Sequence, residues 1–211
     1  MNIRARSKDD KEIKRRKLLD AAKELFARQG YMGTTVGQIT VKAEESTGTF
    51  YLYFNSKTEI YRTLTIEGIR LLRHGIENAI SGSRGGSAAA FTDIARAYLR
   101  FYREQQDYYS IIAIMHLGQE DFGRDTAMLE AVEKETVEIV RIIEGVLSGG
   151  IKDGEFGEVD PSLTTVVLWG MMDGIFLLDQ RKVTGILGHN TEALVGAALE
   201  LIFRGLAKQH R

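Results

Sequence analysis

The chain has 211 residues, of which 44% are apolar, so it can bury a sizeable core and is not globally disordered. It has no cysteine, which excludes disulfides, thiolate metal sites and a cysteine nucleophile. The net charge is −1, but the charges are unevenly distributed. Residues 1–62 carry 13 Lys and Arg against 8 Asp and Glu, and the remaining residues carry 15 against 21. A basic N-terminal region of this kind favours a module that faces nucleic acid.

The first third of the chain predicts four helices, over residues 11–29, 35–42, 46–53 and 56–80. Gly30 follows the apolar stripe of the first helix as a stop signal. Thr35 and Gln38 have the spacing of a capping box at the start of the second helix. Ser46 is the expected N-cap of the third helix, and "SKTE" at 56–59 is a second capping box.

The rest of the chain predicts five more helices, over residues 88–106, 107–118 and 122–148, from Pro161 onward, and over 191–207. Flexible or irregular segments separate them at 81–87, 149–160 and 181–190. Asp160 and Pro161 stand where an N-cap and a first helical residue are preferred. Since there is one proline and no strand alternation, the sequence predicts an all-α fold of about nine helices.

Two short helices joined by a tight turn, after a longer supporting helix, form a helix-turn-helix. The stretch "LLDAAKELFARQGYMGTTVGQI…STGTFYLYFNSKTEI" resembles the N-terminal domain of the tetracycline-repressor (TetR) family of transcriptional regulators. The resemblance rests on the end of the first helix, the Thr-Thr start of the second, "GTFYLYF" and the lysine that opens the fourth. It implies a DNA-binding domain over 1–55 and a helical effector-binding and dimerisation domain over 56–211, with the fourth helix as connector.

The resemblance also implies a DNA surface. Thr35, Thr49 and Tyr51 would donate hydroxyl bonds to phosphates, and Lys57 would add an ammonium. Gly48 has no side chain, which would let the third helix approach the groove closely. The candidates for contacts with base edges are Ser46, Thr47, Thr49, Tyr53 and, on the second helix, Gln38. Thr35 and Ser46 would cap helices in any protein, so the ordered set is the signal and not any one residue.

Glu44 and Glu45 depart from the family pattern, which usually has a Gly and then a small aliphatic residue in this turn. A non-glycine residue at positive φ costs about 1–2 kcal/mol, and we expect Glu44 to stand there. A buried carboxylate needs a partner, so Glu45 is expected to turn outward or to pair with a cation such as Lys42. We expect the two glutamates to tune DNA binding without abolishing it.

In the family, the later helices enclose an effector pocket. Aromatic and methionine side chains in the corresponding helices would suit an apolar or planar effector, although each of them taken singly is more often an ordinary core residue. The candidates are Tyr98, Tyr102, Tyr109, Met115, His116, Trp169, Met172 and Phe176. The four histidines show no metal-ligand spacing, so neither a metal nor a cofactor is expected.

The last two long helices carry a second apolar surface, which the resemblance implies is a homodimer interface. Its candidate residues are Val166, Gly170, Gly174, Leu194, Val195, Ala198 and Ile202. Gly170 and Gly174 are four residues apart and would permit close helix approach. Gly68, inside the fourth helix, has two interpretations, a point of flexing and a site of close packing.

The sequence therefore predicts a cytoplasmic, homodimeric repressor that binds a double-stranded DNA operator and responds to an unknown small-molecule effector. An enzyme is not expected, because no catalytic motif is present. No membrane partner is expected either, since the start is charged and no uninterrupted apolar run reaches about 18 residues. Two alternatives remain: a helical small-molecule sensor or carrier with weakened or lost DNA binding, which Glu44 and Glu45 would explain, and an all-α enzyme.

Overall fold

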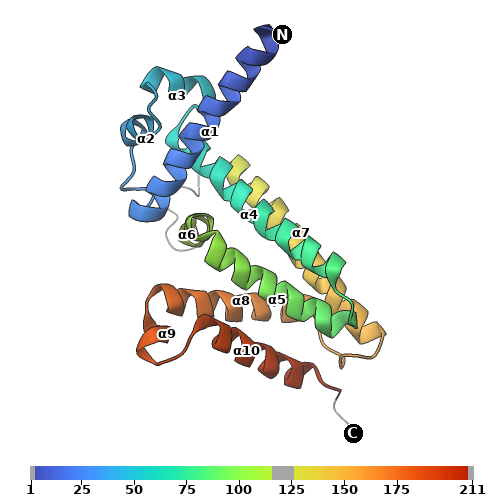
Figure 1. Cartoon of the computed structure of the whole chain (residues 1–211). Helices are drawn as coiled ribbons and strands as arrows, with labels where there is room; N and C mark the ends of the chain where they lie inside the picture. The colour runs from blue at the N-terminus through green and yellow to red at the C-terminus, as the bar shows by residue number, and fades with distance from the viewer. Residues whose placement is uncertain (1–2, 116–125, 209–211) are drawn as a thin grey trace. The chain divides into compact units, whose positions relative to one another are not determined.

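The structure, a computed structural model, describes residues 3–115 and 126–208 and places side chains for residues 10–113 and 130–208. Every regular element in these residues is a helix, so the predicted all-α class is confirmed (Figure 1). The helices are α1 (Ile3–Gln29), α2 (Val36–Lys42), α3 (Thr47–Tyr53), α4 (Lys57–Gly82), α5 (Gly86–Glu104), α6 (Gln106–Met115), α7 (Thr126–Lys152), α8 (Pro161–Gln180), α9 (Val183–Ile186) and α10 (Thr191–Leu206). The single turn α9 lies in the predicted loop 181–190 and accounts for a tenth helix in place of about nine.

Three of the predicted capping signals form as expected, while the predicted box at 56–59 forms only in part. There the Ser56 hydroxyl accepts the Glu59 amide at 3.1 Å, but the Glu59 carboxylate accepts bonds from Asn55. Thr35 is the N-cap of α2, and both bonds of its capping box with Gln38 are present. Ser46 caps α3 and Asp160 caps α8, each by accepting a bond from a backbone amide. Helix α1 is longer than predicted and begins at Ile3, because its charged first turns consist largely of good helix formers.

Packing divides the described chain into two compact units. Unit 1 contains the residues up to Arg70 and those from Gln105 to Glu133, and unit 2 contains Leu71–Glu104 and the residues from Lys134. This division lies inside α4 and assigns α6 to unit 1, whereas the predicted functional boundary stands at residue 55. The packing units and the predicted functional domains are therefore different partitions of the chain.

Unit 1 is built on α1, which contacts α2, α3 and α6. Its core is largely aromatic, since Phe26, Phe50, Phe54 and Tyr61 are buried. The Tyr61 hydroxyl donates a buried 2.7 Å hydrogen bond to the Ile111 carbonyl, which ties α4 to α6. Burial raises the pKa of Tyr61, so the hydroxyl keeps the proton that this bond needs.

Helix α4 also packs closely against α6 at Gly68. A Cβ added there would lie 3.0 Å from Ile112 Cδ1 and 3.2 Å from Tyr108 Cβ. A polar cluster stands one residue earlier on α4, where Glu67 accepts bonds from Tyr108 at 2.9 Å and from Arg16 of α1 at 3.2 Å. Of the two interpretations of Gly68, these contacts favour close packing.

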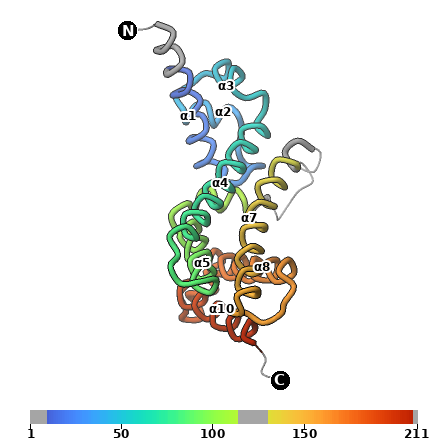
Figure 2. Tube along the Cα trace, turned by 90° about the vertical axis from the view of Figure 1, so that its right-hand side faces the viewer, coloured from blue at the N-terminus to red at the C-terminus, as the bar shows by residue number. Residues whose placement is uncertain are grey.

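Unit 2 has α5, α8 and α10 side by side, as Figure 1 and Figure 2 both show. Its central core cluster is entirely apolar and consists of Phe91, Leu147, Phe156, Leu168 and Leu206. The connection after α7 contributes a cap as well as a core residue. The Glu155 carboxylate accepts 3.0 Å bonds from the backbone amides of Ser87 and Ala88, at the start of α5. These two bonds lower the pKa of Glu155 and keep it anionic at the positive end of the helix.

Among the described helices, α8 has the length and mean hydropathy (1.4) of a membrane span, although only 22% of that window is buried. Two aspartates on α8, Asp173 and Asp179, accept hydrogen bonds from tyrosines of α5. These bonds fit a helix that packs on protein. Exposed apolar residues along one helix are also typical of a surface that another protein covers.

Candidate functional site

One face of α3 is exposed along the helix. It carries Thr47, Gly48, Tyr51 and Leu52, whose spacing places them on neighbouring turns, while Phe50 is buried on the opposite side. Sequence reasoning missed Leu52, which is 80% exposed. An apolar side chain on such a face can contact the methyl group of thymine, so its position next to Tyr51 was the available signal.

Four of the five expected base-reading residues are partly engaged within unit 1. The Ser46 hydroxyl accepts the Thr49 amide at 3.0 Å and bonds to the Thr49 hydroxyl at 2.9 Å. Thr49 and Tyr53 are half-buried. On α2, Gln38 is exposed, but its side-chain carbonyl accepts the Thr35 backbone amide at 2.8 Å. A base contact from Gln38 would therefore use its side-chain N–H groups. Thr35, Thr47 and Tyr51 are exposed residues with hydroxyls, and that of Thr35 is also part of the capping box with Gln38.

The ammonium of Lys57 is placed differently from the expected phosphate contact. Lys57 is half-buried at the first turn of α4, and its Nζ donates 2.8 Å bonds to the carbonyls of both Tyr31 and Thr34. It also lies 4.0 Å from the centroid of the Tyr31 ring. The structure thus directs this charge toward the loop between α1 and α2.

The turn between α2 and α3 has the backbone that the sequence predicts. Glu44 stands at φ 56, in the left-handed region that favours glycine. Glu45 does not pair with Lys42, which instead approaches Glu24 of α1 at 2.5 Å. The Glu45 carboxylate, with its side chain 10% exposed, lies 3.9 Å from Lys14 of α1. The partners of Glu45 and of Lys42 therefore both lie on α1, which local spacing in the turn cannot reveal.

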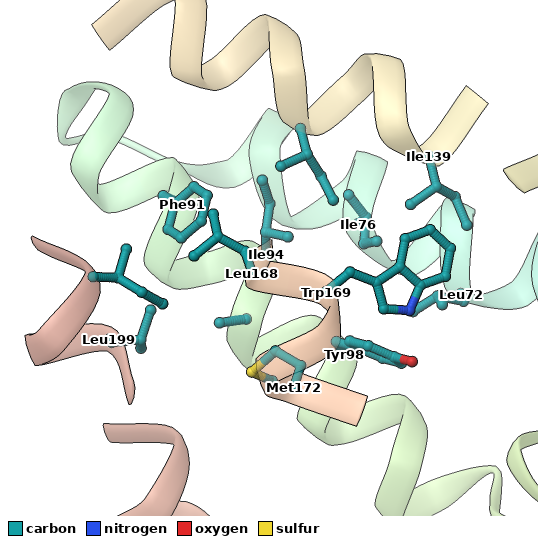
Figure 3. Close-up of a pocket in the computed structure, with 13 residues that line it drawn as sticks. Leu72, Ile76, Phe91, Ile94, Tyr98, Ile139, Leu168, Trp169, Met172 and Leu199 are labelled. Carbon is teal, nitrogen blue, oxygen red and sulfur yellow. The ribbon is translucent and has the colours of Figure 1, made fainter. Parts of the chain in front are cut away.

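Unit 2 contains a cavity whose walls come from α4, α5, α7, α8 and α10. It encloses about 50 Å³, and about 560 Å³ when the space open to solvent is counted. Figure 3 shows Trp169 among Leu72, Ile139 and Tyr98 at one end, with Phe91 and Leu199 at the other. The remaining walls are apolar as well: Ile76, Ile94, Ala95, Ile143, Leu168, Met172 and Ile202.

Three of the predicted pocket residues, Tyr98, Trp169 and Met172, line this cavity. Tyr102 and Phe176 are buried but belong to a stacked aromatic pair between α5 and α8, with ring centroids 4.4 Å apart. Tyr109 is buried in unit 1, so it does not line a cavity of unit 2. His116 lies outside the described residues, as does the side chain of Met115. The aliphatic walls from α4, α7 and α10 were missed, because they look like any helix core in the sequence.

Aspartates of α8 accept hydrogen bonds from two of these tyrosines. The Tyr98 hydroxyl donates to Asp173, and the Tyr102 hydroxyl donates to Asp179 at 2.6 Å. The bond from Tyr102, with a second from Thr184 at 2.7 Å, lowers the pKa of Asp179. Burial raises the pKa of Tyr102. In the Tyr102–Asp179 pair the proton therefore stays on the tyrosine. Both tyrosine–aspartate bonds hold α5 against α8 beside the cavity.

The expected dimer surface is only partly exposed. Val166 is 60% exposed and Gly170 is exposed, while Gly174 and Leu194 are half-buried. Val195 and Ala198 are buried within unit 2, and Ile202 lines the cavity, so these three residues must be corrected to interior positions. The apolar or small residues that α8 and α10 expose instead are Leu163, Val167, Leu178, Ala193, Gly196, Ala197 and Leu201. Both predicted helices thus expose apolar residues, but most of the residues predicted on α10 lie on its inward side.

Known proteins resemble the chain both in part and over its length. Residues 18–64 match the profile described as "Bacterial regulatory proteins, tetR family". The "Fatty acid metabolism regulator protein" of Bacillus subtilis (strain 168) is 24% identical over 200 residues, which cover 93% of this chain and 97% of that protein. Two further relatives from the same organism, 25% and 28% identical, are named as HTH-type transcriptional regulators, in agreement with the prediction that the chain is not an enzyme.

Two solved structures show the same fold. The transcriptional regulator FadR from Bacillus subtilis, in complex with stearoyl-CoA, superposes with a TM-score of 0.72 at 23% identity, over 90% of this chain and 97% of that one. The TetR family transcriptional regulator PfmR from Thermus thermophilus gives a TM-score of 0.70 at 21% identity, over 92% and 99%. The fold similarity thus extends well beyond the helix-turn-helix.

Proposed function

Since the chain belongs to the tetR family of bacterial regulatory proteins, we propose that it is a homodimeric repressor that an apolar small molecule releases from its DNA operator. The observation that carries the proposal is an apolar cavity in a chain that also exposes one face of α3, the second helix of its helix-turn-helix. A cytoplasmic location, where bacterial operators lie, is part of the proposal.

The exposed face of α3 supports insertion into a major groove. The hydroxyls of Thr35, Thr47 and Tyr51 can bond to phosphates or base edges, and Leu52 can contact a thymine methyl. Hydroxyls discriminate weakly among bases, and no Arg or Asn stands on α3 to make a bidentate contact. We therefore expect modest discrimination per half-site, with the dimer supplying much of the specificity.

The cavity lining favours an effector whose buried part is an aliphatic chain. Of the lining side chains, only Tyr98 and Trp169 carry a nitrogen or oxygen, and the Tyr98 hydroxyl already donates to Asp173. One similar structure was solved with stearoyl-CoA, and we extend the acyl chain to this cavity as the effector class. The lining has no cationic side chain, so the phosphates of a CoA ester would lie outside it.

The exposed apolar face of α8 and α10 is the proposed homodimer contact. A Cβ at Gly170, Gly174 or Gly196 would meet nothing within 4 Å in the single chain, so these positions leave room for another helix to approach. The apolar side chains beside them, such as Val166 and Leu201, are exposed as well. A second copy of the chain that presents the same face would cover both the glycines and the exposed apolar side chains.

Effector binding requires the cavity to expand, because an enclosed space of about 50 Å³ is too small for a long acyl chain. Expansion would displace Leu72 and Ile76 of α4, and α4 begins in unit 1 with the helix-turn-helix. The effector would shift the chain toward a state that does not bind DNA by as much as its affinity for that state exceeds its affinity for the DNA-binding state. We propose α4 as the element that transmits the change.

The test titrates the single tryptophan, Trp169, with stearoyl-CoA, stearic acid and CoA alone while DNA binding is followed by anisotropy. The DNA is a footprinted segment from beside the chain's own gene. Both acyl compounds should change the fluorescence, and the compound that binds more tightly should release DNA at a lower concentration. Fluorescence changes without DNA release would mean that the cavity and the reading face are not coupled.

A cavity-filling variant provides the control. Ala95 lines the cavity and is buried, so Ala95→Phe should occupy the space, preserve DNA binding and abolish the response to acyl compounds. An unchanged response would place the effector elsewhere.

The alternative function, a sensor without DNA binding, is tested by salt. Binding that rests on phosphate contacts weakens linearly in a plot of log affinity against log salt concentration. If the chain binds acyl compounds but no duplex even at low salt, the sensor interpretation replaces the repressor.

A further inference from the structure

We infer that Lys57 is a positioning residue that clamps the loop before α2, and so aims Thr35 at the DNA without binding a phosphate itself. Its Nζ donates 2.8 Å bonds to the carbonyls of Tyr31 and Thr34 and lies 4.0 Å from the centroid of the Tyr31 ring. The two carbonyls and the ring face account for most of the directions around the ammonium. The inference rests on the DNA binding of the proposed function.

The loop that Lys57 contacts is pinned by side chains almost throughout. The Gly30 carbonyl accepts the Thr34 hydroxyl at 2.8 Å, and the Gly33 carbonyl accepts the Gln29 side chain at 2.7 Å. Lys57 supplies the bonds to the Tyr31 and Thr34 carbonyls. Backbone groups in a tight loop must find partners. Removing the ammonium takes this partner from the Thr34 carbonyl and leaves the Tyr31 carbonyl with the 3.2 Å bond from the Thr34 amide.

The clamp on the Thr34 carbonyl also restrains the next residue, Thr35. Thr34 is fully buried, and Thr35, the next residue, is the exposed N-cap of α2. A second link fixes the same loop to α4, since the Tyr31 and Thr58 hydroxyls are 2.8 Å apart. The start of α4 thus sets the position of the Thr35 hydroxyl, which is the proposed phosphate contact on α2.

The shape of the site distinguishes Lys57 from a phosphate ligand. A lysine ammonium is compact and can bond to two carbonyls beneath a ring, whereas the arginine guanidinium is a wide planar fork. Arginine at this position should fail to restore the clamp. For a phosphate contact, arginine would be an adequate replacement.

The experiment measures affinity for a random-sequence duplex over a range of salt concentrations for the wild type, Lys57→Met, Lys57→Arg, Thr35→Val and the Lys57→Met/Thr35→Val double variant. Both Lys57 variants should bind roughly tenfold more weakly, the equivalent of one lost hydrogen bond to a charged group. The salt slope should match that of the wild type. In the double variant, Thr35→Val should cause little further loss, because Lys57 acts through Thr35.

Three outcomes would overturn the inference. A salt slope lowered by about 0.9 in Lys57→Met would make Lys57 a phosphate ligand. Wild-type affinity in Lys57→Arg would show that charge alone suffices. Additive losses in the double variant would mean that Lys57 does not act through Thr35. If Lys57→Met fails to fold, the arginine variant still decides between the first two roles.

A measurement without DNA separates the clamp from the proposed function. Amide hydrogen exchange in residues 30–39 should be faster in Lys57→Met than in the wild type, while exchange in unit 2 stays unchanged. Unchanged exchange in the loop would refute the clamp even if DNA binding is intact. A wild-type chain that binds no duplex would instead refute the repressor, with the loop result still standing.

Discussion

Glu44 and Lys182 share an unusual backbone, with φ of 56 and 62, in the left-handed region where a side chain is strained. Glu44 lies in the helix-turn-helix turn and Lys182 in the connection before α9. Replacing either by glycine relieves the same strain, but only one of the two positions lies beside the proposed DNA surface. The pair therefore separates backbone strain from charge.

We expect Glu44→Gly and Lys182→Gly each to raise the free energy of unfolding by about 1 kcal/mol, as measured by denaturant melts. Only Glu44→Gly should also raise DNA affinity, most visibly at low salt, because it removes a negative charge near phosphates. If DNA affinity rises equally in both variants, the gain comes from stability and not from charge. If neither variant is stabilised, the surrounding contacts favour these side chains.

We expect the contact that Asp179 makes between α8 and α5 to weaken in acid. The pKa of Asp179 is lowered from the ordinary value of 3.8, first by the bond from Tyr102, so the unfolded chain takes up this proton at higher pH than the folded one. The stabilisation is therefore complete above the unfolded pKa and lost as pH falls through about 4 and below. Asp179→Asn should cost about 1 kcal/mol at pH 7 and flatten the loss of stability in acid.

Tyr102→Phe is the matched variant, because it removes the donor and leaves the carboxylate. It should reproduce much of the flattening, and the double variant should show little more. Additive effects in melts at pH 3 to 7 would mean that Asp179 is stabilised chiefly by other partners.

At this scale the sequence predicts local bonds well and distant ones poorly. Thr35, Gln38 and Ser46 form their caps as expected, because the partners are three residues away. Glu45 pairs with Lys14 and Lys57 with carbonyls of the preceding loop, because folding brings together groups that lie far apart in the chain. Spacing rules describe one helix at a time and cannot reveal such pairs.

Two glycines of α4, Gly68 and Gly75, allow the effect of side-chain packing on stability to be separated from the effect of helix propensity. Gly68 faces α6, where a Cβ would lie 3.0 Å from Ile112, whereas a Cβ at Gly75 would meet nothing within 4 Å. Gly75→Ala should stabilise the chain by about 0.5–1 kcal/mol, the ordinary gain of alanine in a helix. Gly68→Ala should destabilise it by about 1 kcal/mol, because overpacking outweighs that gain. Thermal melts check both, and equal stabilisation would show that α6 yields freely.

The exposed face of α8 makes a prediction about assembly. Val166→Glu and Gly170→Glu should give monomers in sedimentation, because each would place an unpaired charge in the proposed apolar contact. Neither change should disturb the single chain, since Val166 is 60% exposed and a Cβ at Gly170 meets no atom within 4 Å.

Val137→Glu is the control, as it adds the same charge to a partly exposed position on α7. It should leave the dimer intact. Dimers in all three variants would refute this interface, and monomers in all three would point to a general effect of charge.

Helix identity and core faces were largely predictable, because apolar periodicity is a local signal. The cavity was not, since Ile139 and Ile143 on α7 read as ordinary core positions until five helices are placed around them. The side of α10 was misassigned for a related reason. Val195 and Ala198 are apolar, but so are the exposed Ala197 and Leu201, and periodicity does not say which stripe faces inward.

The whole molecule predicts the layout of its operator. A dimer that places one α3 in each of two major grooves should protect two half-sites whose centres lie about 10 base pairs, or 34–36 Å, apart or a multiple of that distance. Inserting 5 base pairs between them should abolish tight binding, and inserting 10 should restore part of it. Footprints that tolerate every spacer would indicate independently binding subunits.

The cap that Glu155 places on the start of α5 also sets an order of events during synthesis. Its bonds to Ser87 and Ala88 join residues 68 and 67 positions apart. At translation rates of 5–20 residues per second, a newly made α5 waits on the order of 3–13 seconds for this cap. The last of its core partners, Leu206, emerges later still. Unit 2 therefore completes its core only after Leu206 has left the ribosome, and until then its exposed apolar helices are prone to aggregation.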